Sequence, residues 1–261
     1  MLNKYHHLNL YKLLILVIGY GVLVYLSTLY WLEIFHGGHP FKTGDWLINY
    51  QGGLIRRGFI GQLLYYFSGF GINLLWLTYS IQVLIYLLIF HLVFKLFFAT
   101  ERPNTWLLFL FSPAFIFLFP LYDFGASFRK ETLVFLSLIF LACNFLQTKF
   151  FHSYLIGSLV LYSIAVLSHE LAPLSLIFFL YLLFQLKKQN YKFSPFLNIY
   201  FSFYIFLAFF GLLFSYFFHG SSEAATQICH SLELSNLSSR LCFGAIGWLN
   251  QSSQRWPQSC K

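Results

Sequence analysis

Charged residues are scarce in this chain. Only 9% of its 261 residues are Asp, Glu, Lys or Arg, whereas 59% are hydrophobic. A soluble globular domain usually carries about 25% charged residues, so this chain has too few to cover a water-facing surface. The composition therefore excludes an ordinary soluble domain and predicts an integral membrane protein.

The apolar runs also lack the alternation of polar and apolar residues that marks the strands of membrane β-barrels. Several runs approach or exceed the roughly 20 residues that a helix needs to cross a bilayer. We therefore expect an all-α, polytopic membrane protein with about seven transmembrane helices within residues 1–218. The expected spans are 13–35, 72–98, 105–121, 132–148, 151–168, 171–186 and 194–218.

Two segments fall outside these spans. Residues 54–68 place their apolar side chains near one side of a helix and Arg56 elsewhere, which predicts a helix lying in the membrane interface. Residues 219–261 are polar. They predict a non-cytoplasmic tail, or a loop of a longer protein that has been cut short.

Motifs for nucleotides and nucleic acids are missing as well. The net charge of +8 comes without a basic face, a P-loop or a dinucleotide fingerprint. The cations lie instead at the ends of apolar runs, where membrane topology explains them. The expected partners are therefore membrane lipids and not nucleic acids.

Cysteine is rare, with four residues in the chain. Cys143 lies inside an apolar run and is expected to be a small buried residue. The other three lie in the polar tail. There, Cys229 and Cys242 could pair in an oxidising compartment and leave Cys260 over.

The cations also predict the orientation, because cytoplasmic loops carry an excess of Lys and Arg. With the N-terminus inside, eight cations fall on each side. Three of the outer ones lie far from any span and carry little weight, so eight cytoplasmic cations compare with five outer ones. We therefore expect a cytoplasmic N-terminus in a bacterial inner or plasma membrane. The cytoplasmic set is Lys4, Lys12, Lys95, Arg102, Lys149, Lys187, Lys188 and Lys192, and the outer set is Lys42, Arg56, Arg57, Arg129, Lys130 and the distant Arg240, Arg255 and Lys261.

Seven spans would place four polar segments on the same side of the membrane, whichever way the protein sits. These segments are 45–57, 123–131, 169–170 and the tail. Seven of the eight acidic residues lie on that side, all except Glu101. Polar chemistry is therefore expected at one face, outside the cytoplasm.

Asp45 is the candidate catalytic acid or base. One carboxylate at this position can act as a general base or hold one side of a divalent cation, which is the only cofactor that the sequence suggests. The alternative is that Asp45 caps a helix while Trp46 anchors the loop in the interface.

Arg56 and Arg57 form the first candidate anion site. Guanidinium groups are costly in apolar surroundings unless they are paired, and their forks match phosphate and carboxylate geometry. Asn49 lies in the same stretch and is grouped with them. The alternative is an interfacial helix whose arginines touch lipid headgroups without specificity.

Arg129 and Lys130 form the second candidate anion site. They open an expected span, where the helix dipole makes each cation unfavourable by roughly 0.3–1 kcal/mol. A negative group should offset this cost. Either an external phosphate does so, or Asp123 and Glu131 form an internal ion-pair cluster with the two cations.

His169 and Glu170 lie in a tight turn before a short span, residues 171–186. The turn is therefore expected to sink below the membrane surface, where ionisable residues indicate function by default. Either residue then acts as an acid or base, or orients Arg56 or Arg129. The alternative is that Glu170 bridges to a cation and locks two hairpins together.

This layout resembles the GT-C class of polytopic glycosyltransferases, which use polyprenyl-phosphate sugar donors. The resemblance covers roughly the first 70 residues and rests on Asp45 just after the first span, followed by the interfacial helix at 54–68. It implies that Asp45 is the catalytic or metal-associated acid. Envelope polysaccharide polymerases of the O-antigen type are similar in placing arginines on the non-cytoplasmic face. The cations that would meet the lipid phosphate are Arg56, Arg57, Arg129 and Lys130.

The chain departs from the GT-C pattern in its lone Asp45, its fewer spans and its long polar end. Two other functions therefore stay open. A transporter or flippase of an anionic or lipidic substrate predicts polar residues through the membrane, where Gln82 and Asn144 are the main ones. A scaffold predicts that every cation is matched by an acid, whereas an enzyme predicts Asp45 in an open cavity.

Overall fold

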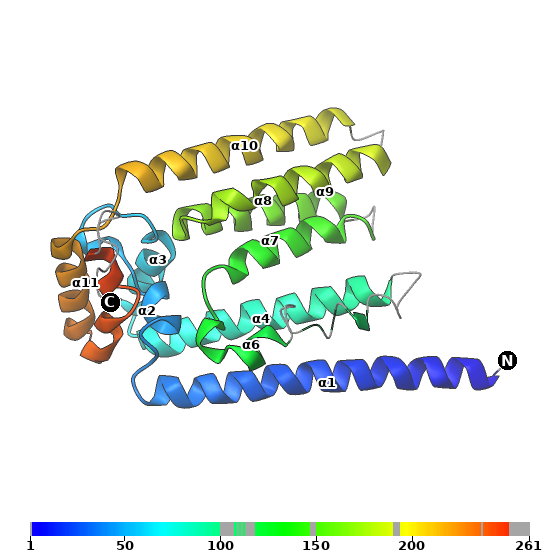
Figure 1. Cartoon of the computed structure of the whole chain (residues 1–261), viewed down its shortest axis with the longest axis horizontal. Helices are drawn as coiled ribbons and strands as arrows, with labels where there is room; N and C mark the ends of the chain where they lie inside the picture. The colour runs from blue at the N-terminus through cyan, green and yellow to red at the C-terminus, as the bar shows by residue number, and fades with distance from the viewer. Residues whose placement is uncertain are drawn as a thin grey trace, which may run out of the picture.

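The computed structural model describes residues 2–99, 107, 108, 110, 112, 118–146, 150–189, 194–235 and 237–250. All regular secondary structure among these residues is helical. Its long helices run along a common axis, with α1 at one edge and α10 at the other (Figure 1). They are α1 (Leu2–Phe35), α4 (Leu74–Phe98), α7 (Thr132–Cys143), α8 (Phe151–Ser168), α9 (Leu176–Gln189) and α10 (Ser194–Phe217).

Four helical segments in the described part of the chain are long and apolar enough to cross a membrane. This finding supports an α-helical integral membrane protein, but it does not confirm seven spans. The span expected at 105–121 lies mostly outside the described residues. The four segments are Leu10–Phe35, Leu74–Phe98, Phe151–Ser168 and Pro195–Phe217.

Two expected spans correspond to shorter helices. The span expected at 132–148 is helical only to Cys143, and the side-chain amide of the next residue, Asn144, donates to the carbonyl of Leu141 at 3.1 Å. In the span expected at 171–186, Pro173 lies in the 3-10 turn η3 (Ala172–Ser175), and α9 begins only at Leu176. Neither helix reaches the roughly 20 residues that a bilayer crossing needs.

The outer surfaces of the bundle are apolar. Large side chains such as Val24, Ile177 and Phe209 are each more than 60% exposed. A soluble protein rarely exposes large apolar patches, whereas helices in contact with lipid do so without cost. These surfaces therefore indicate contact with membrane lipid.

The end of the bundle opposite the N-terminus carries a cluster of short helices (Figure 1). We call it the capped end, and define the cap as residues 222–250. The short helices are α2 (Lys42–Trp46), α3 (Phe59–Ser68) and α11 (Ser222–Leu234), with the 3-10 turns η1 (Tyr50–Gly52), η5 (Ser239–Phe243) and η6 (Gly247–Asn250).

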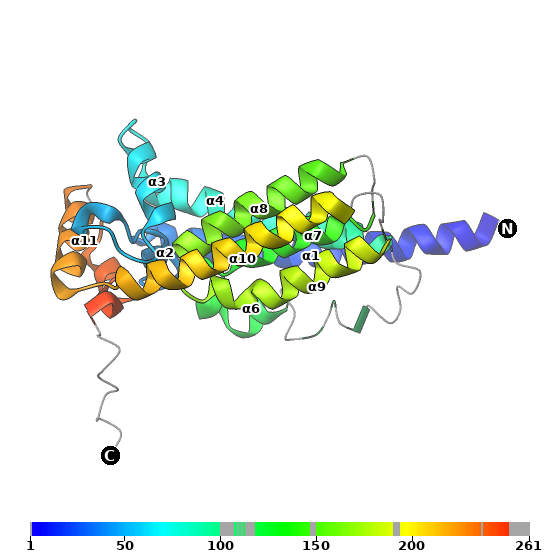
Figure 2. The same ribbon diagram turned by 90° about the horizontal axis from the view of Figure 1, so that it is seen from above.

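The helix expected at 54–68 begins only at Phe59. Arg57 has a left-handed φ of 70°, which a continuous helix does not allow, so the chain turns before α3 starts. Figure 2 shows α3 running across the end of the bundle, at a steep angle to its long helices.

The cap folds back onto the loops that follow α1. Cys229 and Cys242, the pair that the sequence left open, form a disulfide with their Cα atoms 5.8 Å apart. A Cβ atom added at Gly52 would lie 2.5 Å from the carbonyl oxygen of Ala224, so only glycine allows this close approach. The segment expected to be a polar tail is thus folded through residue 250, while Cys260 lies outside the described residues.

Gly61 offers a test of the packing between α3 and the loop after α2. A Cβ atom there would overlap the carbonyl oxygen of Ile48, which is backbone and cannot turn away. We expect Gly61→Ala to destabilise the protein by about 1–3 kcal/mol, measured as thermal unfolding in detergent. Gly21→Ala is the control, because a Cβ at Gly21 meets nothing within 4 Å. Equal melting temperatures for the two variants would contradict this packing.

Candidate functional site

Glu170 holds both adjacent arginines at the capped end. Its Oε2 atom lies 2.9 Å from Nε of Arg56 and 3.0 Å from Nε of Arg57, and its Oε1 atom accepts from Nη2 of Arg57. Burial alone would raise the pKa of Glu170, but its bond to Arg57 outweighs burial and lowers it. The two arginines are therefore engaged internally.

Lys130 is fully buried and pairs with Asp45. Its Nζ donates to the carbonyl of Arg57 at 2.7 Å and lies 3.9 Å from Oδ1 of Asp45. Burial lowers the pKa of Lys130 to about 8, although the charge of Asp45 acts in the opposite direction. Arg56, Arg57 and Lys130 thus behave largely as the scaffold hypothesis predicts.

Asp45 lies inside α2, whose N-cap is Phe41. The expected capping role is therefore wrong, and so is the interfacial role of Trp46, because its side chain is fully buried. Asp45 is 6% exposed, and its Oδ1 atom accepts no hydrogen bond within the described residues. The two nearby cations, Arg57 and Lys130, are both 3.9 Å away. This buried oxygen therefore receives no hydrogen bond from a described residue.

A strained turn at Phe128 positions the next three charged residues. Phe128 has a φ of 56°, which a bulky residue rarely adopts. Its carbonyl accepts from Trp46 Nε1 at 2.9 Å and from Gln82 Nε2 at 2.7 Å. Its N–H donates to the hydroxyl of Tyr86 at 3.1 Å. These three bonds hold the turn from which residues 129–131 project.

His169 and Glu131 form a second polar pair. Nε2 of His169 lies 3.2 Å from Oε1 of Glu131, and its Nδ1 accepts from the N–H of Leu171 at 3.3 Å. The proton on the neutral ring therefore belongs on Nε2. Burial would raise the pKa of Glu131, but the bond and charge of His169 outweigh burial and lower it to about 2.

Arg129 is the cation that stays without an acid. It makes no ion pair with any residue that the structure describes, and its guanidinium lies 5.9 Å from the ring centre of Phe41. The expected cluster of Arg129 with Asp123 does not form. Asp123 is exposed and accepts from the N–H of Ala126 at 3.1 Å, which caps the turn η2 (Phe124–Ala126).

Most of these side chains surround a small cavity, which we call the polar chamber. Its volume is about 160 Å³. It brings together residues from four separate stretches of the chain, including the cap. Its walls are Phe41, Asp45, Arg57, Arg129, Glu131, His169, Leu171, Ala245 and Trp248.

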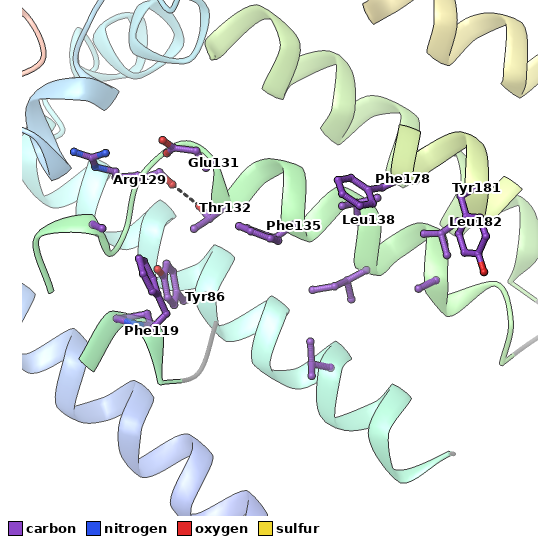
Figure 3. Close-up of a pocket in the computed structure, with 15 residues that line it drawn as sticks. Tyr86, Phe119, Arg129, Glu131, Thr132, Phe135, Leu138, Phe178, Tyr181 and Leu182 are labelled. Atoms are coloured by element: carbon purple, nitrogen blue, oxygen red, sulfur yellow. Dashed lines mark hydrogen bonds between the residues drawn. The ribbon is translucent and has the colours of Figure 1, made fainter. Parts of the chain in front are cut away.

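A second and larger cavity of about 710 Å³ lies against α7, and we call it the apolar groove. Figure 3 shows Arg129, Glu131 and Thr132 at one end, with Phe135 and Leu138 leading away along α7. Arg129 and Glu131 belong to both cavities. The remaining walls come from α4, α6 (Phe119–Tyr122), η2, α7 and α9, and comprise Tyr86, Val93, Phe119, Pro120, Ala126, Ile139, Ala142, Phe178, Tyr181 and Leu182.

Asn49 does not join either cavity. It is fully buried, its Oδ1 accepts from the N–H of Gln51 at 3.0 Å, and its amide points to Ser231 of the cap at 3.5 Å. The geometry therefore supports a structural role for Asn49, which joins the cap to η1.

Sequence reasoning missed a buried ion pair and one wall of the polar chamber. Lys42 is fully buried, with Nζ 2.6 Å from Oε2 of Glu33 and 3.3 Å from the ring centre of Phe124. The only feature of the sequence that pointed to this ion pair was a lysine soon after an apolar run. The missed wall consists of Ala245 and Trp248. The sequence signal that could have indicated it was a tryptophan in an otherwise polar segment.

The residues present do not fit a divalent cation at Asp45. Its nearest charged neighbours are Arg57 and Lys130, both cations, and these would repel a metal ion. Across the part of the chain that the structure describes, no group of three or more His, Cys, Asp or Glu side chains is arranged to hold a metal.

Acid is expected to weaken the capped end. The pKa values of Glu131 and Glu170 are lowered by folding. Their contribution is complete above the unfolded pKa of about 4.3 and is lost as the pH falls through the folded pKa. We therefore expect the melting temperature to fall from about pH 4.5 toward pH 2. The same decline in Glu131→Gln/Glu170→Gln would contradict this assignment.

Comparison with protein-family models, with curated proteins and with solved structures finds no match to this chain. A functional conclusion therefore rests on the geometry of the capped end. The features to be explained are the two cavities that share Arg129 and Glu131 as walls, the lack of an acid partner for Arg129 among the described residues, and the Asp45 oxygen that receives no hydrogen bond there.

Proposed function

We propose that this integral membrane protein binds a lipid-linked phosphate at the capped end and transfers the sugar that the phosphate carries. It would act as a lipid-phosphate-dependent glycosyltransferase or polysaccharide polymerase. The observation that carries this proposal is that Arg129 and Glu131 line both a polar chamber and a neighbouring apolar groove. A ligand with a polar head and a long apolar chain matches both cavities at once.

Arg129 supplies the phosphate contact in this proposal. It lines both cavities and has no acid partner among the described residues. A guanidinium in such surroundings is costly unless an anion pairs with it, and its planar fork suits two phosphate oxygens. The lipid chain would then follow the apolar groove along α7.

Asp45 is the proposed catalytic base. In the transfer step the oxygen of an acceptor hydroxyl bonds to the anomeric carbon of the donor sugar. The bond between that carbon and the phosphate oxygen breaks, and the lipid phosphate leaves with the electron pair. The hydroxyl proton passes to the carboxylate of Asp45, which lines the polar chamber.

His169 and Glu170, both expected to be catalytic, are better supported as positioning residues. Both nitrogens of His169 are occupied, by Glu131 and by the N–H of Leu171. Glu170 acts through Arg57, whose guanidinium lines the polar chamber next to Asp45.

We propose that the capped end faces the non-cytoplasmic side, with the N-terminus in the cytoplasm of a bacterial inner or plasma membrane. Lys95, Lys187 and Lys188 lie in the last turns of α4 and α9, at the opposite end of the bundle (Figure 1). The disulfide of the cap suits an oxidising compartment. Most cations at the capped end are paired with acids, so they count less as evidence that this end is cytoplasmic.

The scaffold remains the second candidate, because three of the four expected anion-site cations are paired internally. A transporter has less support. Gln82 donates to the carbonyls of Lys42 and Phe128 and accepts from Tyr30, so its side chain is used within the fold. Asn144 likewise bonds to the backbone of α7.

Binding of polyprenyl phosphate to the protein in lipid nanodiscs tests the proposed function. We expect Arg129→Ala to weaken binding at least about tenfold, since a charge-assisted bond contributes roughly 1.5–3 kcal/mol, and Arg129→Lys to lie in between. Arg240→Ala is the control, because this exposed cap residue lines neither cavity. Equal binding by Arg129→Ala and the unmodified protein would favour the scaffold.

A further inference from the structure

The polar chamber has the size of one six-membered ring. Its volume is about 160 Å³, and a cavity of about 150 Å³ is known to hold one benzene molecule. The chamber is therefore too small for a second ring or for a lipid chain. Whatever occupies it is a single compact group.

The walls of the chamber differ in character. Asp45 and Glu131 offer acceptors, while Arg57 and Arg129 offer donors. Trp248 supplies an aromatic wall, and its ring lies 5.1 Å from that of Phe41 at 71°. A matching ligand must therefore have hydrogen-bonding groups around its edge and an apolar face.

The segment around Trp248 is held in place by the loop before α11 and by the loop after α1. The neighbouring Leu249 is 5% exposed and packs against Gly220, and the N–H of Ala245 donates to the carbonyl of Pro40 at 3.2 Å. Trp248 itself remains 56% exposed and is one of the residues that line the chamber. A fixed backbone with an exposed indole suits a contact surface for a ligand.

We propose that the polar chamber binds one pyranose ring, which stacks on Trp248 and turns its hydroxyl groups toward Asp45, Glu131 and Arg129. A pyranose carries hydroxyl donors and acceptors around its rim and C–H groups on its face, which matches both kinds of wall. This inference rests on the proposed function and deepens it, because it places one sugar of the reaction against a residue of the cap.

Direct binding of methyl glycosides tests the inference without any turnover. The probes are the methyl pyranosides of glucose, galactose, mannose and N-acetylglucosamine, observed by saturation-transfer NMR with the full-length protein in nanodiscs. We expect at least one probe to bind, with about two- to twelvefold weaker affinity for Trp248→Leu, in line with an aromatic contact of about 0.5–1.5 kcal/mol. Trp248→Tyr should keep most of the affinity.

Phe243→Leu is the matched control, because Phe243 is an aromatic residue of the cap, is 81% exposed and lines neither cavity. Its affinity for the glycosides should not change. Binding of no glycoside, or equal binding by Trp248→Leu and the unmodified protein, would overturn the inference. If Trp248→Leu does not fold, Trp248→His takes its place with the same expected loss.

The glycoside-binding test can fail or succeed independently of the polyprenyl phosphate test of the proposed function. Loss of polyprenyl phosphate binding in Arg129→Ala without any glycoside binding would retain the lipid site and reject the sugar site. Glycoside binding that depends on Trp248, in a protein that does not bind the lipid phosphate, would retain the sugar site and reject the proposed donor.

Discussion

Asp45→Asn is expected to reduce sugar transfer by about 10²–10⁴-fold, the range typical for loss of a general base. Asparagine has nearly the same size, but its amide cannot accept a proton from the attacking hydroxyl. The loss should therefore appear in turnover, while binding of polyprenyl phosphate at Arg129 is retained. This combination distinguishes a catalytic carboxylate from one that only supports the fold.

The fold should tolerate this change. Arg57 keeps Glu170 as its partner, and Nζ of Lys130 keeps the carbonyl of Arg57. Because burial already lowers the pKa of Lys130 to about 8, the lysine can lose its proton once the neighbouring charge is gone. We therefore expect Asp45→Asn to accumulate in the membrane at normal levels.

The measurement is product formation in the native host, with the chromosomal copy replaced by the variant and lipid-linked intermediates quantified. Glu233→Gln is the matched control, since it makes the same chemical change at an exposed site on α11. If Asp45→Asn accumulates normally and the intermediates stay unchanged, Asp45 is not the base and the glycosyltransferase proposal fails.

Glu170→Ala is expected to be the most destabilising single change at the capped end. It leaves Arg56 and Arg57 next to each other without their shared carboxylate. Breaking a buried ion pair by removing one partner costs about 3–5 kcal/mol, and we expect about 3 kcal/mol because the pair is partly exposed. This contact also joins the turn after α8 to the loop before α3.

The loss should lower the melting temperature by about 6–12 °C for a chain of this size, measured in detergent. Glu233→Ala serves as the exposed control on α11. Replacing Arg57 and Glu170 together, as Arg57→Met/Glu170→Met, should recover part of the loss, since the more buried of the two arginines is then removed along with its carboxylate. An unchanged melting temperature for Glu170→Ala would show that this bridge does not support the capped end.

Part of the site could be predicted from the sequence. The segments around Asp45, Arg57, Glu131 and His169 were expected on one face, and their side chains do meet at the capped end. Their partners were not predictable, because residues such as Arg57 and Glu170 are 113 positions apart. Local patterns carry no information about which of several acids faces a given cation.

Helix lengths were also only partly predictable. Composition correctly identified the four long apolar helices. It could not show that α7 ends at Cys143 or that α9 starts after the turn containing Pro173. Both boundaries lie at single residues, Asn144 and Pro173, that an average over an apolar run conceals.

The sequence by itself determined the class of the protein. Few charges and long apolar runs leave membrane helices as the way to satisfy the backbone away from water. Only the tertiary structure decided which charges are available. It paired Arg56, Arg57 and Lys130 with acids and left Arg129 between two cavities. It also brought Trp248 from the polar end of the chain to a wall of the polar chamber. These outcomes depend on long-range packing, because a charge is neutralised or left free by its neighbours in space and not by its neighbours in the chain.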